Sequence, residues 1–192
     1  CPICSGRKAV LSNCLATLNP ELAKEWDPIK NKDSSPFDVK PGSSKKVWWK
    51  CGRGDDHDWQ TAVENRSRGT GCPFCANQKV AKSNCLTTRY PKIASQWHPF
   101  KNGELTPDNI VAGSNKKRWW KCDKGDDHEF EASPNARISG GGCPICSGRK
   151  AVLSNCLATT HPDISKEWHP TKNGDLTPDD VVSASNKKAW WK

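Results

Sequence analysis

The sequence repeats itself with a period of 71 residues. Cys1, Cys72 and Cys143 lie 71 positions apart. Other cysteines and tryptophans keep the same spacing without an insertion or deletion, among them Cys14/Cys85/Cys156, Cys51/Cys122, Trp26/Trp97/Trp168 and the pairs Trp48-Trp49, Trp119-Trp120 and Trp190-Trp191. A fixed period of this kind indicates a tandem array of small modules rather than one large globular domain.

Each module is poor in the side chains that build an ordinary core. Hydrophobic residues make up 34% of the chain, with no Met and one Tyr but 10 Trp and 11 Cys. Units this small and this poor in aliphatic side chains usually need disulfides or a metal ion to fold. The module core should therefore consist of a few large rings held by cysteine chemistry.

The cysteine spacing favours a metal. The motif Cys-Pro-x-Cys occurs at Cys1/Cys4, Cys72/Cys75 and Cys143/Cys146, and a gap of two residues lets both thiolates bind one ion. Redox dithiols of similar spacing belong to thioredoxin-like βαβ patterns, which are absent from the sequence. Metal-binding thiols favour a reducing, intracellular compartment, and nothing in the sequence resembles a signal peptide or a membrane span of roughly 18 apolar residues.

A complete set of ligands follows from the same spacing. Cys51, His57, Cys72 and Cys75 recur as Cys122, His128, Cys143 and Cys146, and three thiolates with one imidazole are typical of a four-coordinate structural zinc. Asp55 or Asp56 could replace His57, although zinc beside thiolates prefers nitrogen. Cys1 and Cys4 are then the last two ligands of a preceding module. With no open coordination position we expect no catalysis, and we expect packing, not ligation, for Cys14, Cys85 and Cys156.

The ligands divide the chain into modules. Residues 5–75 and 76–146 form two complete modules, residues 1–4 end a preceding one, and residues 147–192 begin a module that stops before its zinc ligands. We therefore expect the parent protein to continue in both directions.

Local patterns predict a short helix and a hairpin in each module. We expect helices at Pro20–Trp26, Pro91–Trp97 and Pro162–Trp168, the first capped by Asn19, and turns at Ser35-Pro36, Thr106-Pro107 and Thr177-Pro178. A strand over residues 46–51 should place Val47, Trp49 and Cys51 on one face, and residues 57–63 should be its partner. The stretch 65–71 is expected to be a loop, and His98, His161 and His169 to be surface or capping residues.

The chain resembles a known family of tandem zinc-ribbon or treble-clef repeat domains. The resemblance rests on Pro-Glu-Leu-Ala-Lys-Glu-Trp at 20–26, on 42–51 with its Lys-Lys-Val-Trp-Trp-Lys-Cys, and on Gly-Cys-Pro-Phe-Cys at 71–75, and it extends over the whole chain. It implies a small α+β fold of treble-clef/zinc-ribbon-like modules, each with a short helix, a β-hairpin and a zinc knuckle. It also implies nucleic-acid binding, since such repeats often stand beside nuclease-like domains.

The basic residues near the paired tryptophans point to the same partner. The net charge is +9, and cations alternate with aromatic residues as phosphate contact and base stacking require. The candidate nucleic-acid-binding residues are Lys45, Lys46, Lys50, Arg66, Lys116, Lys117, Arg118, Lys121, Arg137, Lys187 and Lys188. The alternative is a scaffolding array that binds protein partners. We expect neither a membrane nor a small-molecule substrate.

Overall fold

A computed structural model describes residues 8–192, so the predicted ligands Cys1 and Cys4 lie outside the described residues. The chain divides into two compact units, residues 1–84 and 85–192. Residues 76–84, which follow Cys75, fold back onto the first unit. In that segment Ala81 packs against the core, and the side chain of Asn84 donates hydrogen bonds to the carbonyls of Phe74 and Lys79.

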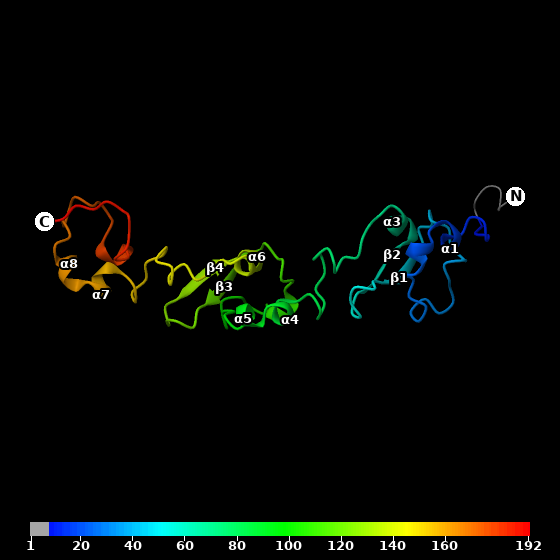
Figure 1. Ribbon diagram of the computed structural model, residues 1–192, viewed down its shortest axis with the longest axis horizontal. Helices are drawn as coiled ribbons and strands as arrows, with labels where there is room; N and C mark the ends of the chain where they lie inside the picture. Colours follow the sequence, from blue (N-terminus) through cyan, green and yellow to red (C-terminus); the bar gives the residue numbers. More distant parts are fainter. Residues whose placement is uncertain (1–7) are drawn as a thin grey trace. The chain divides into compact units, whose positions relative to one another are not determined.

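Within residues 8–84, the first unit contains three short helices and one hairpin. Figure 1 shows the hairpin β1–β2 with α1 and α3. The helices are α1 (Leu15–Leu18), α2 (Pro20–Ala23) and α3 (Val63–Ser67), and the strands are β1 (Lys46–Lys50) and β2 (Asp58–Ala62). β1 and β2 are antiparallel, with Trp49 opposite Trp59 and Lys50 opposite Asp58.

The second unit repeats this order and continues into the third copy of the repeat. It contains α4 (Leu86–Arg89), α5 (Pro91–Ala94), η1 (Pro107–Asn109), β3 (Arg118–Lys121), β4 (Glu129–Ala132), α6 (Pro134–Ile138), α7 (Leu157–Thr160), α8 (Pro162–Lys166) and η2 (Pro178–Asp180). Trp120 lies opposite Phe130 in the antiparallel pair β3–β4. Two small hairpins with short helices make this a small α+β protein.

The predicted first helix is shorter than expected. α2 ends at Ala23, and residues 24 and 25 form a turn in which the amides of Glu25 and Trp26 donate to the carbonyls of Leu22 and Ala23. Trp26 then forms a bridge with Trp49, and the amide of Lys50 donates to the carbonyl of Glu25. Asn19 occupies the N-cap position without a side-chain hydrogen bond to the helix. A tighter turn and the bridge to β1 thus replace the last helical turn that the local pattern predicts.

The predicted loop at 65–71 is also partly helical, because α3 extends into its start, and α6 occupies the equivalent position one repeat later. In the second unit Pro134 takes the first helical position and the Ser133 hydroxyl accepts a hydrogen bond from the amide of Ala136. Helix α1 was not predicted, nor were α4 and α7, its counterparts one and two repeats later.

The core of each hairpin lies on the face that the alternation predicts. Trp49 and Trp120 are fully buried, and Trp26 meets Trp49 edge-on with ring centroids 5.7 Å apart. Trp48 lies on the other face of the strand, where the ammonium group of Lys30 covers its ring at 4.5 Å. In the third copy Trp191 makes the same edge contact with Trp168, yet it is 43% exposed, because no hairpin partner covers it within residues 8–192.

Of the three unassigned histidines, His98 is not a surface residue. It is buried, and its Nδ1 accepts hydrogen bonds from the amides of Phe100 and Lys101, at 3.2 and 3.1 Å. The expected capping role is therefore present. In the first unit the carboxylate of Asp27 accepts hydrogen bonds from the amides of Ile29 and Lys30. Asp27 therefore makes the same capping contacts as His98, although the residue type differs.

Candidate metal centre

Two of the four candidate ligands are held by the end of the hairpin. The amide of Cys51 donates to the carbonyl of His57 at 2.9 Å, and the amide of His57 donates to the carbonyl of Gly54 at 3.1 Å. The loop between them is tight, since a Cβ atom on Gly54 would lie 2.9 Å from the Cδ2 atom of His57. Glycine at this position therefore allows the imidazole to fold back over its own turn.

The other two ligands come from the knuckle that follows α3. Cys72 and Cys75 lie on one turn, which closes at Asn77 with a φ of 55°, a conformation that Asn tolerates better than most residues. Phe74 stacks on the imidazole of His57, with ring centroids 5.2 Å apart. In the second unit Ile145 and Gly148 occupy the positions of Phe74 and Asn77.

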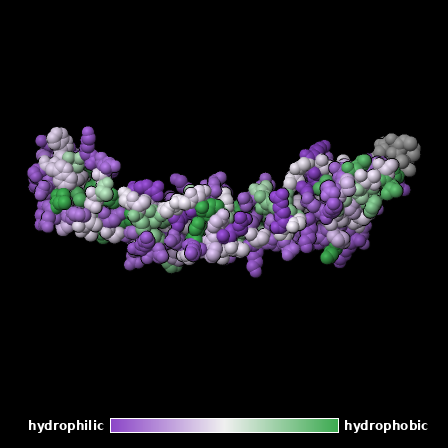
Figure 2. Space-filling model, in the orientation of Figure 1, coloured by the Kyte–Doolittle hydropathy of each residue, from purple (hydrophilic) through white to green (hydrophobic). Residues whose placement is uncertain are grey.

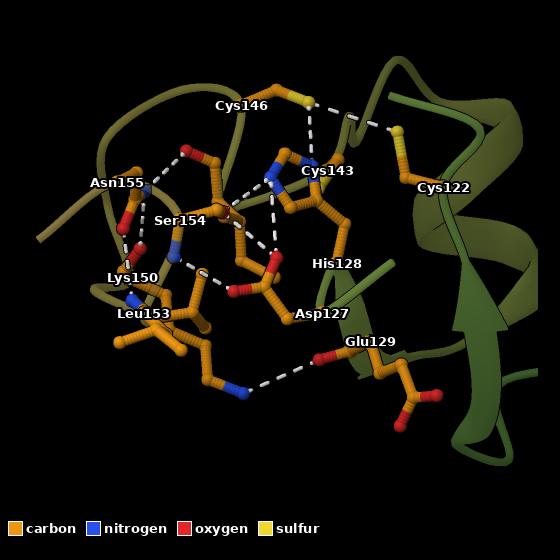
Figure 3. Close-up of polar contacts among 12 residues, drawn as sticks. Cys122, Asp127, His128, Glu129, Cys143, Cys146, Lys150, Leu153, Ser154 and Asn155 are labelled. Carbon is orange, nitrogen blue, oxygen red and sulfur yellow. Dashed lines mark hydrogen bonds and ion pairs between the residues drawn. The ribbon is translucent and has the colours of Figure 1, made fainter. Parts of the chain in front are cut away.

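The four donor atoms converge in both units. The Sγ atoms of Cys51 and Cys75 are 3.7 Å apart, and the Nδ1 atom of His57 lies 3.8 Å from Sγ of Cys72 and 3.5 Å from Sγ of Cys75. The second group repeats this with distances of 3.6, 3.9 and 3.3 Å (Figure 3). Tetrahedral zinc with ordinary bond lengths requires about 3.8 Å between sulfurs and about 3.5 Å between sulfur and nitrogen. The donor sets fit that ion.

The crowding of the thiols affects their protonation in both groups. Desolvation and the neighbouring thiols of Cys51 and Cys72 raise the pKa of Cys75 to about 11 when no metal is bound, and the pKa of Cys146 is raised to about 11 in the same way. The six cysteines of the two donor groups are free thiols, not disulfides. A bound divalent cation removes the proton and offsets the repulsion between thiolates.

The model of a family described as "Probable Treble clef zinc finger domain" matches residues 22–78, 93–149 and 164–192. The chain belongs to this family. The three matches follow the 71-residue repeat, and both complete Cys3His groups fit the structural zinc sites of treble clef fingers. No curated protein matches the chain.

Beyond the ligands, the structure brings two serines without a predicted role close to the histidines, and Asp56 lies beside His57 rather than replacing it in the ligand group. Ser83 and Asp56 lie beside the outer nitrogen of His57, and Ser154 and Asp127 beside that of His128. The motif Ser-Asn-Cys recurs in all three copies and is the sequence signal for these serines, whereas the cysteines that follow them are buried outside the ligand groups.

Two residues predicted to contact nucleic acid are buried instead. The guanidinium group of Arg66 lies against the rings of Trp49 and Trp59, at 5.5 and 5.3 Å, and bonds Glu25 and the carbonyl of Thr70. Arg137 is buried in the same way in the second unit. Their burial removes these two guanidinium groups from the surface, and this corrects the expectation that they contact phosphate.

The remaining basic candidates lie at the surface. Lys45, Lys46, Lys50, Lys116, Lys117, Lys187 and Lys188 are exposed, whereas Arg118 and Lys121 are half-buried. The outer face of the first hairpin thus presents Lys46 and Lys50 on either side of Trp48.

Proposed function

We propose that the tandem zinc modules bind nucleic acid through the lysines at the outer face of each hairpin. The observation that carries the proposal is the recurrence of exposed lysines at 45–50 and again one and two repeats later, on a chain of net charge +9. Ammonium groups at a regular spacing suit contact with successive phosphates.

The contacts of the outer tryptophans favour phosphate contact over base stacking. The ammonium group of Lys30 covers one face of Trp48, and those of Lys101 and Lys172 cover Trp119 and Trp190 at 4.6 and 5.0 Å. A base that stacked on the covered face would have to displace the lysine. The proposed binding is therefore mainly electrostatic, with little sequence preference.

The two hairpins arrange their charges differently. Glu129 and Glu131 lie opposite Lys121 and Trp119, where the first hairpin has Asp58 and Gln60 opposite Lys50 and Trp48. The extra carboxylate of Glu131 opposes phosphate binding, whereas Arg118 adds a cation where the first hairpin has Val47.

A scaffolding array that binds protein partners is the alternative. Ile29 and Phe100 occupy equivalent positions and are 78% and 84% exposed. Figure 2 shows hydrophilic residues over most of the visible surface, with hydrophobic residues in small separate patches. Patches of this size favour weak, repeated contacts over one extended apolar interface.

The proposed role is binding, without catalysis. Four protein donors fill the tetrahedral coordination of each zinc and leave no position for a reacting water. The proposal includes a reducing compartment, because the cysteines of both groups are free thiols. Within the described residues, no helix is long and apolar enough to cross a membrane.

The experiment that tests this function is a salt titration of the zinc-loaded chain with single-stranded and double-stranded DNA and RNA. A log–log slope of several units supports phosphate neutralisation. If no nucleic acid binds at low salt, the proposal is wrong, and the exposed positions of Ile29 and Phe100 become the first surface to test for protein contacts.

A further inference from the structure

The outer nitrogen of each candidate histidine ligand is engaged by a serine and an aspartate. Nε2 of His57 lies 3.0 Å from Oγ of Ser83. The amide and the hydroxyl of Ser83 both bond the carboxylate of Asp56, at 2.9 and 2.7 Å. Asp56 directly precedes His57 in the hairpin loop, whereas Ser83 follows the knuckle, so the contact joins two distant segments of the unit.

The second unit contains the same three residues in the same arrangement. Nε2 of His128 lies 3.4 Å from Oγ of Ser154, and Ser154 bonds Asp127 through its amide and its hydroxyl, both at 2.8 Å. Figure 3 shows the imidazole of His128 between the cysteine sulfurs on one side and Ser154 with Asp127 on the other. The recurrence excludes an accidental contact in one loop.

The proton count along this chain of groups is consistent. A metal on Nδ1 requires the lone pair of that atom, so the single proton of a neutral imidazole sits on Nε2. That N–H donates to the Ser83 oxygen, and the Ser83 hydroxyl donates to the Asp56 carboxylate.

We propose that Ser83 with Asp56, and Ser154 with Asp127, are positioning residues of the zinc centres, which select Nδ1 of the histidine as the ligand atom and orient its ring. Partners of this kind fix the tautomer of a ligating imidazole and raise its basicity. The direct carboxylate–histidine contact familiar from other zinc sites is here extended by one serine hydroxyl. This role does not depend on the partner that the modules bind.

The same contacts tie the connector to the zinc centre. Residues 76–84 lead from Cys75 to Ser83, and Asn84 bonds the carbonyls of Phe74 and Lys79. In the second unit Asn155 bonds the carbonyls of Ile145 and Lys150 at 3.0 and 3.1 Å. Zinc binding thus also orders the segment that follows each knuckle.

The test compares zinc binding by Ser83→Ala, Asp56→Asn and Ser83→Thr in the full chain, with the unaltered second site as an internal reference. Chelator competition should show a loss of about 10- to 100-fold in affinity at the first site for Ser83→Ala and Asp56→Asn. Ser83→Thr keeps the hydroxyl and should restore the affinity. Ser12→Ala changes the same Ser-Asn-Cys motif upstream of both hairpins and should leave both affinities unchanged.

A spectroscopic readout separates positioning from simple destabilisation. The imidazole ¹⁵N shifts of His57 should show a protonated Nε2 and a metal-bound Nδ1 in the zinc-loaded parent chain, and the Nε2 shift should move in Ser83→Ala. Trypsin should also cut the zinc-loaded Ser83→Ala chain faster after Lys79. If Asp56→Asn and Ser83→Ala both keep the parent affinity within twofold and leave the His57 shifts unchanged, the proposal is overturned. Metal on Nε2 in the parent chain overturns it too.

Discussion

Glu25 and Arg66 form an ion pair that joins the residues after α2 to helix α3. The arginine is buried against Trp49 and Trp59, while the glutamate is about one-third exposed. The second unit has the same contact with a neutral partner, Gln96, on Arg137. The buried arginine is thus common to both units, and the charge of its partner is not.

We expect Arg66→Ala to destabilise the first unit by about 3 kcal/mol, because it removes a buried cation from between two rings and leaves Glu25 without its partner. Glu25→Gln copies the second unit and should cost less than about 1 kcal/mol. Amide hydrogen exchange of β1 and β2 measures both. Equal losses from the two variants would show that the ion pair, not the buried guanidinium, matters most.

Gly54→Ala should weaken zinc binding at the first site by about tenfold or more, because the new methyl group meets the ring of His57 and moves a ligand. Gly52→Ala is the matched control, since a Cβ atom there has no neighbour within 4 Å. Chelator competition on the two variants compares them directly. An unchanged affinity in Gly54→Ala would mean that the loop opens at no cost.

Removal of one ligand should unfold one unit only. Cys72→Ser is expected to lose one of the two zinc equivalents held by the complete groups and the dispersed NMR signals of β1 and β2, because zinc binding supplies about 10 kcal/mol or more of folding free energy in such modules. Cys14→Ser alters a buried cysteine outside these groups and should leave the zinc content unchanged. Metal analysis and NMR spectra decide between these outcomes.

Zinc affinity should rise with pH. Because the pKa of Cys75 is raised to about 11 in the metal-free unit, its thiol is protonated at neutral pH and zinc must displace that proton. At every pH below that pKa the proton competes with zinc for the Cys75 sulfur, and the competition weakens as the pH rises. We expect at least a tenfold gain in affinity per pH unit near neutrality, measured by calorimetry in buffers of different ionisation enthalpy. A pH-independent affinity contradicts this assignment.

Lys50→Gln should weaken nucleic-acid binding about equally for all sequences and reduce the salt slope by about 1, as expected for the loss of one phosphate contact. Lys24→Gln is the control, because Lys24 is exposed in the first unit but already pairs with Glu21 and lies outside the hairpin. Fluorescence anisotropy at several salt concentrations gives both slopes. A Lys50→Gln chain with the parent slope would remove Lys50 from the interface.

Much of the protein follows from the sequence alone. The 71-residue period indicates the array, and the Cys and His spacings name the residues that the structure gathers into two ligand groups. The alternation at Val47, Trp48 and Trp49 correctly predicts which indole is buried. These features are local, because spacing along a strand or turn already determines which side chains share a face.

Only the tertiary structure decided the rest, since it depends on contacts between distant segments. α2 ends at Ala23, three residues before the predicted end at Trp26, where a bridge to Trp49 holds the chain against β1. Arg66 looks like a surface cation in the sequence, but two rings and Glu25 enclose it once the hairpin and α3 pack together. The orientation of His57 also depends on tertiary structure. Its Nδ1 atom faces the sulfur of Cys75, and its Nε2 atom meets Ser83, which reaches the hairpin loop only because the connector after the knuckle folds back.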